Sequence, residues 1–235
     1  MKKLLAILLL LCLCIPGVLA EGHLELSETR LLRSVDGEYG DIRIYLQVTN
    51  TGDAPVALNE ASVLLVNGNS ELLEEVYTYS MYPAVLQPGK VGYMSLWYSD
   101  VADRVLSVTD YHVKFDEAHE YLPALQYLSC TYEYVELENE NYTEYKLIFC
   151  VENVTDTVQW EPSIAMILRN ENGKILDVQE TGLYCVGIPA NGMIMYEVYL
   201  SDYDLQRWAD AGQPFSRLES YVYTTEYPVF TVVYE

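Results

Sequence analysis

The sequence contains one outline twice, at a separation of about one hundred residues, which is the length of a small β-sandwich. Segment 41–66, DIRIYLQVTNTGDAPVALNEASVLLV, recurs as segment 144–168, EYKLIFCVENVTDTVQWEPSIAMIL. Individual positions also correspond, and the matching pairs are Asn50 and Asn153, Asp53 and Asp156, Ser62 and Ser163, Pro88 and Pro189, and Ser99-Asp100 and Ser201-Asp202. A duplication of this length predicts two small domains that share one fold.

Alternating apolar and polar residues predict that both copies consist of β-strands. The residues expected to point inward are Ile42, Ile44, Leu46 and Val48 in the first copy, and Tyr145, Leu147, Phe149 and Val151 in the second. Turn sequences such as Asp36-Gly37, Asn67-Gly68-Asn69 and Asn172-Gly173 separate the predicted strands. Strands at intervals of roughly ten residues with turns of this kind favour a sandwich over a βαβ fold.

One short helix is predicted in the second copy, where Ser201 or Asp202 can cap the stretch Tyr203–Ala211 and Gly212 ends it. The equivalent stretch of the first copy, Val101–Val105, predicts no more than a single turn. The predicted fold class is therefore all-β, with two tandem immunoglobulin-like β-sandwich domains and one short helix in the second.

The predicted domain boundary lies in the charged stretch DEAHEYLP at 116–123, which ends in proline and does not alternate. It divides the chain into a first sandwich at 21–119 and a second at 120–235. Because this linker is short, we expect the two sandwiches to touch and to form one semi-rigid rod.

The first twenty residues, 1–20, resemble a signal peptide. Lys2 and Lys3 precede the apolar stretch Leu4–Ile15, which is shorter than the roughly 20 residues that a membrane span needs. Cleavage is predicted after Ala20, and Cys12 and Cys14 follow Leu rather than the small residue that a lipoprotein signal needs. We therefore expect an exported chain, secreted or held in the cell envelope, with no membrane insertion after signal removal.

The formal charge of the chain is −22, and it becomes −24 when Lys2 and Lys3 leave with the signal peptide. Phosphate contacts require clustered Lys and Arg, so this composition argues against nucleic acid as a partner. It also argues against docking on anionic lipid. Since the acidic residues are interspersed with β-branched and aromatic ones, they are expected to form a solvated exterior.

The order of strands and turns, with N-x-x-D at a strand end and Pro-Gly before a later strand, resembles the FxLYD family. These are small immunoglobulin-like domains of exported bacterial and archaeal proteins. The stretch 166–170, Met-Ile-Leu-Arg-Asn, stands where the family has F-x-L-Y-D, and 63–67 with Gly68 takes that place in the first copy. Neither copy has the family's Phe, Tyr and Asp together. The resemblance implies a fold and a cell-envelope context, and it supplies no catalytic residue.

Three cysteines remain after signal removal: Cys130, Cys150 and Cys185. A hairpin centred on Glu140 would place Cys130 directly opposite Cys150, close enough for a disulfide, and export would permit one. A Cys150–Cys185 bridge and three reduced thiols remain as alternatives.

The sequence offers weak candidates for a metal site. His112 and His119 could join a carboxylate in a zinc site, but their spacing matches no established ligand motif. The stretch DGEYGD at 36–41 has some of the oxygen ligands of a calcium loop and is read instead as a hairpin turn. We expect no metal and no cofactor.

The sequons at Asn141 and Asn153 matter only in a glycosylating host.

Nothing in the sequence points to a catalytic residue. It contains no nucleophile elbow, phosphate loop or dinucleotide fingerprint, and in so acidic a chain any pair of carboxylates chosen for a glycosidase would be arbitrary. We therefore expect that the protein is not an enzyme.

Tyrosine is unusually frequent, with 22 residues. Tyr98 and Tyr196 share the inward register, whereas Tyr93, Trp97 and Tyr199 have the outward one. Outward aromatic residues can stack on sugar rings or anchor a protein partner. They can also fill cross-strand pairs or a contact between domains.

These observations favour a non-catalytic exported protein with a binding or structural role at the bacterial cell surface or in the envelope. Its partner, a protein or a glycan, is unknown. The first alternative is a carbohydrate-binding module that uses Tyr93, Trp97 and Tyr199, and the second is a secreted hydrolase.

Overall fold

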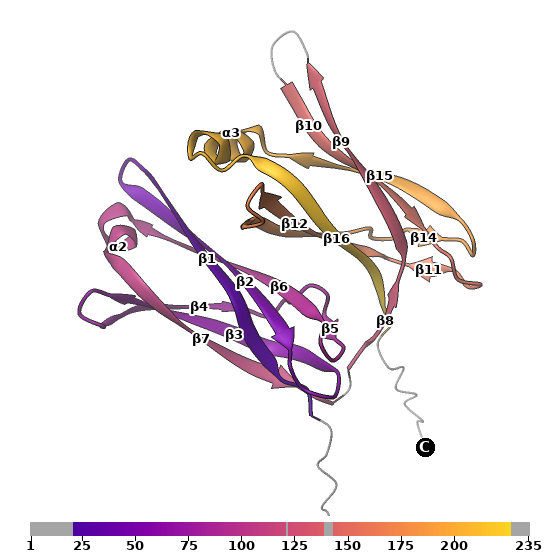
Figure 1. Ribbon diagram of the computed structural model, residues 1–235, viewed down its shortest axis with the longest axis horizontal. Helices are drawn as coiled ribbons and strands as arrows, with labels where there is room; N and C mark the ends of the chain where they lie inside the picture. The colour runs from indigo at the N-terminus through magenta and orange to yellow at the C-terminus, as the bar shows by residue number, and fades with distance from the viewer. Residues whose placement is uncertain (1–20, 121, 139–142, 227–235) are drawn as a thin grey trace, which may run out of the picture.

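The computed structural model describes residues 21–120, 122–138 and 143–226. The predicted signal peptide, its cleavage site after Ala20 and the sequon at Asn141 lie outside these residues. The described chain consists mainly of antiparallel strands in two β-sandwiches, as predicted (Figure 1).

The first sandwich packs a three-stranded sheet, with the order β1-β2-β6, against a sheet centred on β3. In the second sheet β3 pairs with β4, β5 and β7, and a short helix, α2, connects β6 to β7. The elements are β1 (Leu24–Asp36), β2 (Tyr39–Asn50), β3 (Val56–Asn67), β4 (Leu72–Thr78), β5 (Val85–Leu86), β6 (Val91–Val101), α2 (Ala102–Ser107) and β7 (Val108–Ala118).

The second sandwich repeats this arrangement, with one sheet in the order β15-β10-β9, another in the order β13-β12-β16-β8, and a short pair formed by β11 and β14. Helix α3 connects β15 to β16. The elements are β8 (Ala124–Tyr127), β9 (Ser129–Glu138), β10 (Thr143–Glu152), β11 (Gln159–Trp160), β12 (Ser163–Asn170), β13 (Ile175–Gly182), β14 (Gly187–Ile188), β15 (Met193–Leu200), α3 (Asp202–Asp210) and β16 (Phe215–Glu226).

The two sandwiches share one strand order, so the duplication read from the sequence is also a duplication of topology. The sheet β1-β2-β6 corresponds to β9-β10-β15, and β4-β3-β7 corresponds to β13-β12-β16. The second sandwich has two more strands, because β11 and β12 together correspond to β3 and because β8 from the linker pairs with the end of β16. Strands β1 to β7 lie within 21–119, and β8 to β16 lie within 120–235.

The repeated asparagines explain part of the sequence match. Asn50 is buried at the end of β2, where its Nδ2 donates to the carbonyls of Ala54 at 2.8 Å and Leu86 at 2.9 Å. Asn153 follows β10, and its Nδ2 donates to the equivalent carbonyls of Thr157 and Ile188 at 2.7 and 2.9 Å. Each side chain therefore joins the loop after its own strand to a short strand further along the chain, β5 or β14, because a buried amide needs these partners.

Each sandwich has its own apolar core, built mostly from the residues predicted to point inward. Ile42, Ile44, Leu46 and Val48 are fully buried in the first core, and Leu147, Phe149 and Val151 are fully buried in the second. Tyr98 is buried as well, whereas Tyr145 and Tyr196 are partly buried against the second core.

Turns and helices follow the sequence signals. Asp36 pairs with Tyr39 across a two-residue turn in which Gly37 has φ +62°, so 36–41 is a hairpin, as predicted. Ser201 Oγ accepts a hydrogen bond from the amide of Asp204 and caps α3. Helix α2 has six residues, more than the single turn expected for this stretch, and its Val105 is buried. Among the described residues, no helix is both long and apolar enough to cross a membrane.

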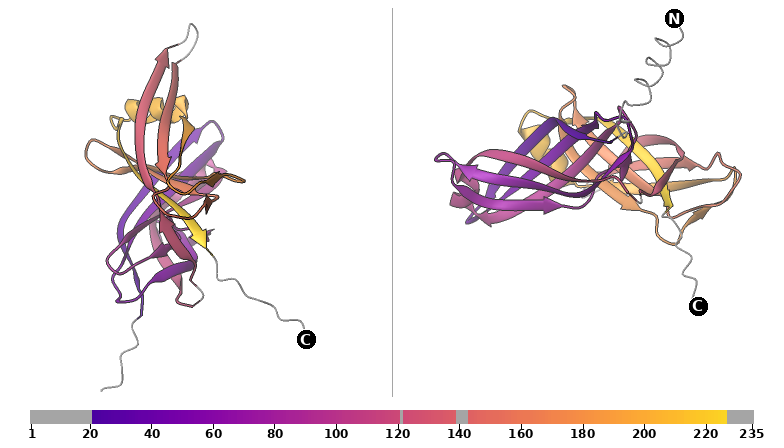
Figure 2. Two further views of the ribbon diagram at one scale, coloured as in Figure 1. Left: turned by 90° about the vertical axis from the view of Figure 1, so that its right-hand side faces the viewer. Right: turned by 90° about the horizontal axis from the view of Figure 1, so that it is seen from below.

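The two sandwiches lie face to face rather than end to end, so the prediction of a rod is wrong. A third apolar cluster joins Tyr45 and Tyr93 of the first sandwich to Ile167, Ile175 and Val178 of the second. The outer face of β1-β2-β6 thus packs on the outer face of the sheet that contains β12, β13 and β16, and Figure 2 shows the two bodies side by side. The contact arises because both outer faces carry apolar residues that a free sheet would expose.

Candidate functional site

The three aromatic residues proposed as a ligand-binding surface lie in three different environments. Tyr93 on β6 is 2% exposed and belongs to the apolar cluster between the sandwiches. Trp97, on the same strand, is 64% exposed, and Tyr199 on β15 is 61% exposed on the outer sheet of the second sandwich. They do not form one surface, and the alternative of an inter-domain contact applies to Tyr93.

A polar network surrounds Tyr93 in the inter-domain contact. Arg169 on β12 is 5% exposed, and its Nη2 donates to the Tyr93 hydroxyl at 3.0 Å and to Gln47 Oε1 at 2.9 Å. Its Nε donates to Glu219 Oε2 at 3.2 Å. Burial and the nearby Glu219 carboxylate raise the pKa of Tyr93 to about 12. The network therefore fixes the two sandwiches to one another.

Trp97 stands beside a hollow at the edge of this contact, which we call the Trp97 groove. Its cavity of about 290 Å³ is lined by Arg43, Tyr45, Ser95, Leu96, Trp97 and Asp177. Arg43 lies directly opposite Trp97 in the β2–β6 ladder. An exposed indole ring beside a guanidinium and a carboxylate is a combination that can stack on a sugar ring and hydrogen-bond its hydroxyls.

Asp177 is the carboxylate of the Trp97 groove, and it is contributed by β13 of the second sandwich. Its oxygens accept hydrogen bonds from the backbone amide of Val178 at 2.9 Å and from Gln179 Nε2 at 2.6 Å. Burial raises the pKa of Asp177, although these hydrogen bonds and Arg43 favour its charged form. Tyr45, buried beside it, also has a raised pKa because of burial.

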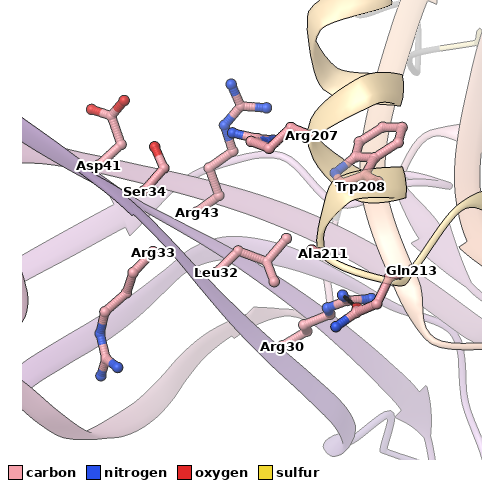
Figure 3. A pocket seen from close by; sticks show the side chains of 10 residues that line it. All are labelled: Arg30, Leu32, Arg33, Ser34, Asp41, Arg43, Arg207, Trp208, Ala211 and Gln213. Atoms are coloured by element: carbon pink, nitrogen blue, oxygen red, sulfur yellow. Dashed lines mark hydrogen bonds between the residues drawn. The ribbon is translucent and has the colours of Figure 1, made fainter. Parts of the chain in front are cut away.

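A second hollow adjoins the first and shares Arg43 with it; we call it the arginine pocket (Figure 3). Its cavity of about 100 Å³ lies between β1, β2 and α3, and the lining includes Arg30, Arg43, Arg207, Trp208 and Gln213. Arg33 and Asp41 stand at its border, and Figure 3 shows both side chains directed away from Trp208.

Few carboxylates lie close enough to neutralise the arginines of the pocket. Arg43 Nη1 and Arg207 Nη2 both approach one oxygen, Asp204 Oδ1, at 3.4 and 2.8 Å. Arg30 donates instead to neutral groups of the second sandwich, the Ile175 carbonyl and Gln213 Oε1. The pocket is thus a concentration of positive charge in a chain whose formal charge is −22.

Two further hollows lie outside these two sites. One, of about 470 Å³ beside the linker, is lined in part by Tyr82, Glu120 and Glu180. Another, of about 690 Å³ beside α3, contains Tyr134 and Tyr145, whose rings stack at 6.5 Å. The hollow beside the linker thus holds two carboxylates, and the hollow beside α3 is lined by aromatic rings.

The predicted Cys130–Cys150 bridge is absent from the structure, in which Cys130, Cys150 and Cys185 are free thiols. In the β9–β10 ladder Cys130 faces Val151, one position away from Cys150. A slip of one residue turns a side chain to the opposite face of a sheet. Accordingly Cys130 packs against the second core, whereas Cys150 Sγ lies 3.6 Å from Met193 Sδ.

The histidines considered for a zinc site are separated. His112 is exposed on β7 opposite Leu64, and His119 lies beside Glu117 at 3.6 Å. In the part of the chain that the structure describes, no group of three or more His, Cys, Asp or Glu side chains is arranged to hold a metal ion. The sequon asparagine Asn153 is buried, so its amide is closed to modification in the folded protein.

The residues that sequence reasoning missed are Arg30, Arg43, Arg207 and Asp177. None belongs to a motif, and only the docking of the two sandwiches brings them together. The one available signal was the scarcity of basic residues, 13 in all, which makes each buried or paired arginine worth attention.

Comparisons with known proteins leave the chain without an assigned relative. No protein-family model and no curated protein matches it. It is similar to the crystal structure of red sea bream transglutaminase, with 10% identity and a TM-score of 0.21, over 75% of this chain and 27% of that one. It is also similar to the CBM22-1–CBM22-2 tandem domain of Paenibacillus barcinonensis Xyn10C, with 10% identity and a TM-score of 0.17, over 92% of this chain and 90% of that one. Neither similarity is close enough to carry a function to this chain.

Proposed function

We propose that this chain is a non-catalytic binding protein, exported to the bacterial cell surface or envelope, and that the Trp97 groove is its binding site for a carbohydrate. The observation that carries the proposal is the position of Trp97, which is exposed beside Arg43 and Asp177 where the two sandwiches meet. Export rests on the signal-like residues 1–20.

The arrangement of the groove supports a sugar ligand. Large exposed aromatic rings favour stacking on the apolar face of a sugar, and charged groups beside them can bond the hydroxyls at its edge. Asp177 accepts and Arg43 donates, so the groove offers both kinds of partner. Since residues of both sandwiches line it, binding would require the inter-domain contact to stay closed.

Substitution of Trp97 is the direct test, because Trp160 provides a matched control. Trp160 on β11 is also 64% exposed and lies outside the groove. We expect the exported chain to bind glycans on a broad array, Trp97→Ala to abolish that binding without loss of folding, and Trp160→Ala to retain it. Failure of the wild-type chain to bind any glycan would refute the carbohydrate assignment.

The hydrolase alternative is less well supported, since it needs two carboxylates in one hollow. The lining of the Trp97 groove includes Asp177 as its one carboxylate. Glu120 and Glu180 share the hollow beside the linker, and Glu180 Oε1 there accepts a hydrogen bond from the Tyr223 hydroxyl at 3.2 Å. Glycan hydrolysis that disappears in Glu180→Gln would establish an enzyme and overturn the non-catalytic proposal.

A further inference from the structure

A nitrogen donor that lines the arginine pocket is buried without a hydrogen-bond acceptor among the described residues. It is Nε1 of Trp208, a residue that is 5% exposed. Beside it, Arg207 Nη2 lies 2.8 Å from Asp204 Oδ1, its ion-pair partner. Buried donors without a partner are rare in folded proteins because each is costly to leave unsatisfied.

The charge around these donors is also unbalanced. The single carboxylate of Asp204 serves both Arg43 and Arg207, and Arg30 has no carboxylate at ion-pair distance in the described part of the chain. Burial lowers the pKa of Arg30, as expected for a guanidinium held away from water beside neutral partners. A site with surplus positive charge and the unmet N–H of Trp208 lacks an acceptor that carries negative charge.

The size of the cavity limits what that acceptor can be. About 100 Å³ is much more than a single water needs, and it is well below the volume of a pocket for a drug-sized ligand. Figure 3 shows Arg43, Arg207 and Trp208 around the upper part of the pocket, with Arg30 and Gln213 below. The guanidinium fork matches oxyanions in particular, because it can donate two parallel hydrogen bonds.

We propose that the arginine pocket binds a small oxyanion, with Arg43 and Arg207 as its charged partners and the Trp208 indole N–H as a further donor. The anion occupies the space between β2 of the first sandwich and α3 of the second, and it holds these two elements together. This inference goes beyond the proposed function and does not depend on it, since Trp97 does not line the arginine pocket.

The indole signals of the three tryptophans test this assignment directly. The exported chain, labelled with ¹⁵N, is titrated with sodium phosphate, sodium sulfate or sodium acetate against sodium chloride at equal ionic strength. We expect the Trp208 indole signal to move in a saturable manner and the Trp160 signal to stay in place. Saturation with phosphate and sulfate would assign a tetrahedral oxyanion, and saturation with acetate alone would assign a carboxylate.

Variants decide whether the pocket is responsible. Arg207→Gln is expected to weaken binding at least about tenfold, whereas Arg217→Gln, which removes an exposed arginine of β16, is expected to leave it unchanged. Should Arg207→Gln fail to fold, Trp208→Phe keeps an aromatic ring in the core and removes only the N–H donor. The rise in Tm produced by phosphate is then expected to shrink.

Three results would overturn the proposal: no saturable shift with any oxyanion, an equal shift with chloride, or unchanged affinity in both Arg207→Gln and Trp208→Phe. Any of them would mean that water fills the cavity and that the arginines serve only the contact between the sandwiches.

Discussion

The guanidinium of Arg169 in the second sandwich lies 5.5 Å from the ring centroid of Tyr93 in the first, and its Nη2 donates a hydrogen bond to the Tyr93 hydroxyl. Arg169 lies on the outer face of β12, at the centre of the inter-domain contact. A residue that would be solvent-facing in an isolated domain here joins two domains.

Arg169→Met is expected to destabilise the protein by about 2–3 kcal/mol, because it removes the donor to the Tyr93 hydroxyl and the cation beside Glu219, whose carboxylate then keeps only the hydroxyls of Tyr93 and Tyr221 as donors. Urea denaturation followed by tryptophan fluorescence measures the loss. Arg217→Met, at an exposed position of β16, is the control, and its cost is expected to stay within about 0.5 kcal/mol. Equal costs for the two variants would show that the network contributes nothing to stability.

The repeated asparagines allow a prediction for both sandwiches. Asn50→Ala and Asn153→Ala are each expected to cost about 2–4 kcal/mol, because each change leaves buried carbonyls and amides of a loop unpaired. Thermal unfolding measures both losses. Asn59→Ala is the control, since Asn59 is exposed and makes one hydrogen bond of 3.3 Å. A cost at Asn153 no greater than that at Asn59 would contradict the structural role assigned to the repeat.

The free thiols are expected to react with a disulfide reagent in a definite order. Cys185 is exposed and reacts first, whereas burial raises the pKa of Cys130 to about 11, so roughly one thousandth of it is thiolate at pH 8. Cys185→Ser should remove the fast phase. After denaturation without reductant, all three cysteines of the chain from residue 21 onward should react. If only one cysteine reacts, a bridge between Cys130 and Cys150 is established, which the structure lacks.

Much of each sandwich could be predicted from the sequence because one face of every central strand is buried. The alternation around Ile44 and Phe149 assigns the inward register, and glycine at positions such as Gly37 marks the turns where φ is positive. These signals are local. Both copies contain them, which is why the repeat predicted the fold class.

The contact between the sandwiches and the two sites beside it could not be predicted in the same way. Period-two alternation shows that Tyr45 and Tyr93 point away from their own core, but it does not reveal what covers them. Arg43 and Asp204 meet across 161 residues of sequence. The register of β9 and β10 differed by one position from the expected one, because the sequence did not define the centre of the hairpin.

Asp177 leads to a prediction about pH. Burial raises its pKa in the folded protein above the value of about 3.9 expected in the unfolded chain, so the native state binds this proton more tightly. The contribution of Asp177 to stability is therefore most favourable below pH 3.9. It is lost as the pH rises through the folded pKa, where a buried carboxylate must ionise.

Asp177→Asn removes that ionisation and retains an oxygen that can accept from the amide of Val178. Its Tm relative to that of the wild type should rise as the pH increases from 3 through the folded pKa of Asp177, and then level off. Differential scanning calorimetry over this range measures the trend. Asp110→Asn is the control variant. Asp110 is exposed, and like Asp177 it accepts a hydrogen bond from the backbone amide of the next residue, here Tyr111 at 2.8 Å. If the relative Tm of Asp177→Asn falls with pH instead, the ion pairing with Arg43 outweighs the burial of Asp177, and the assigned direction of its pKa shift is wrong.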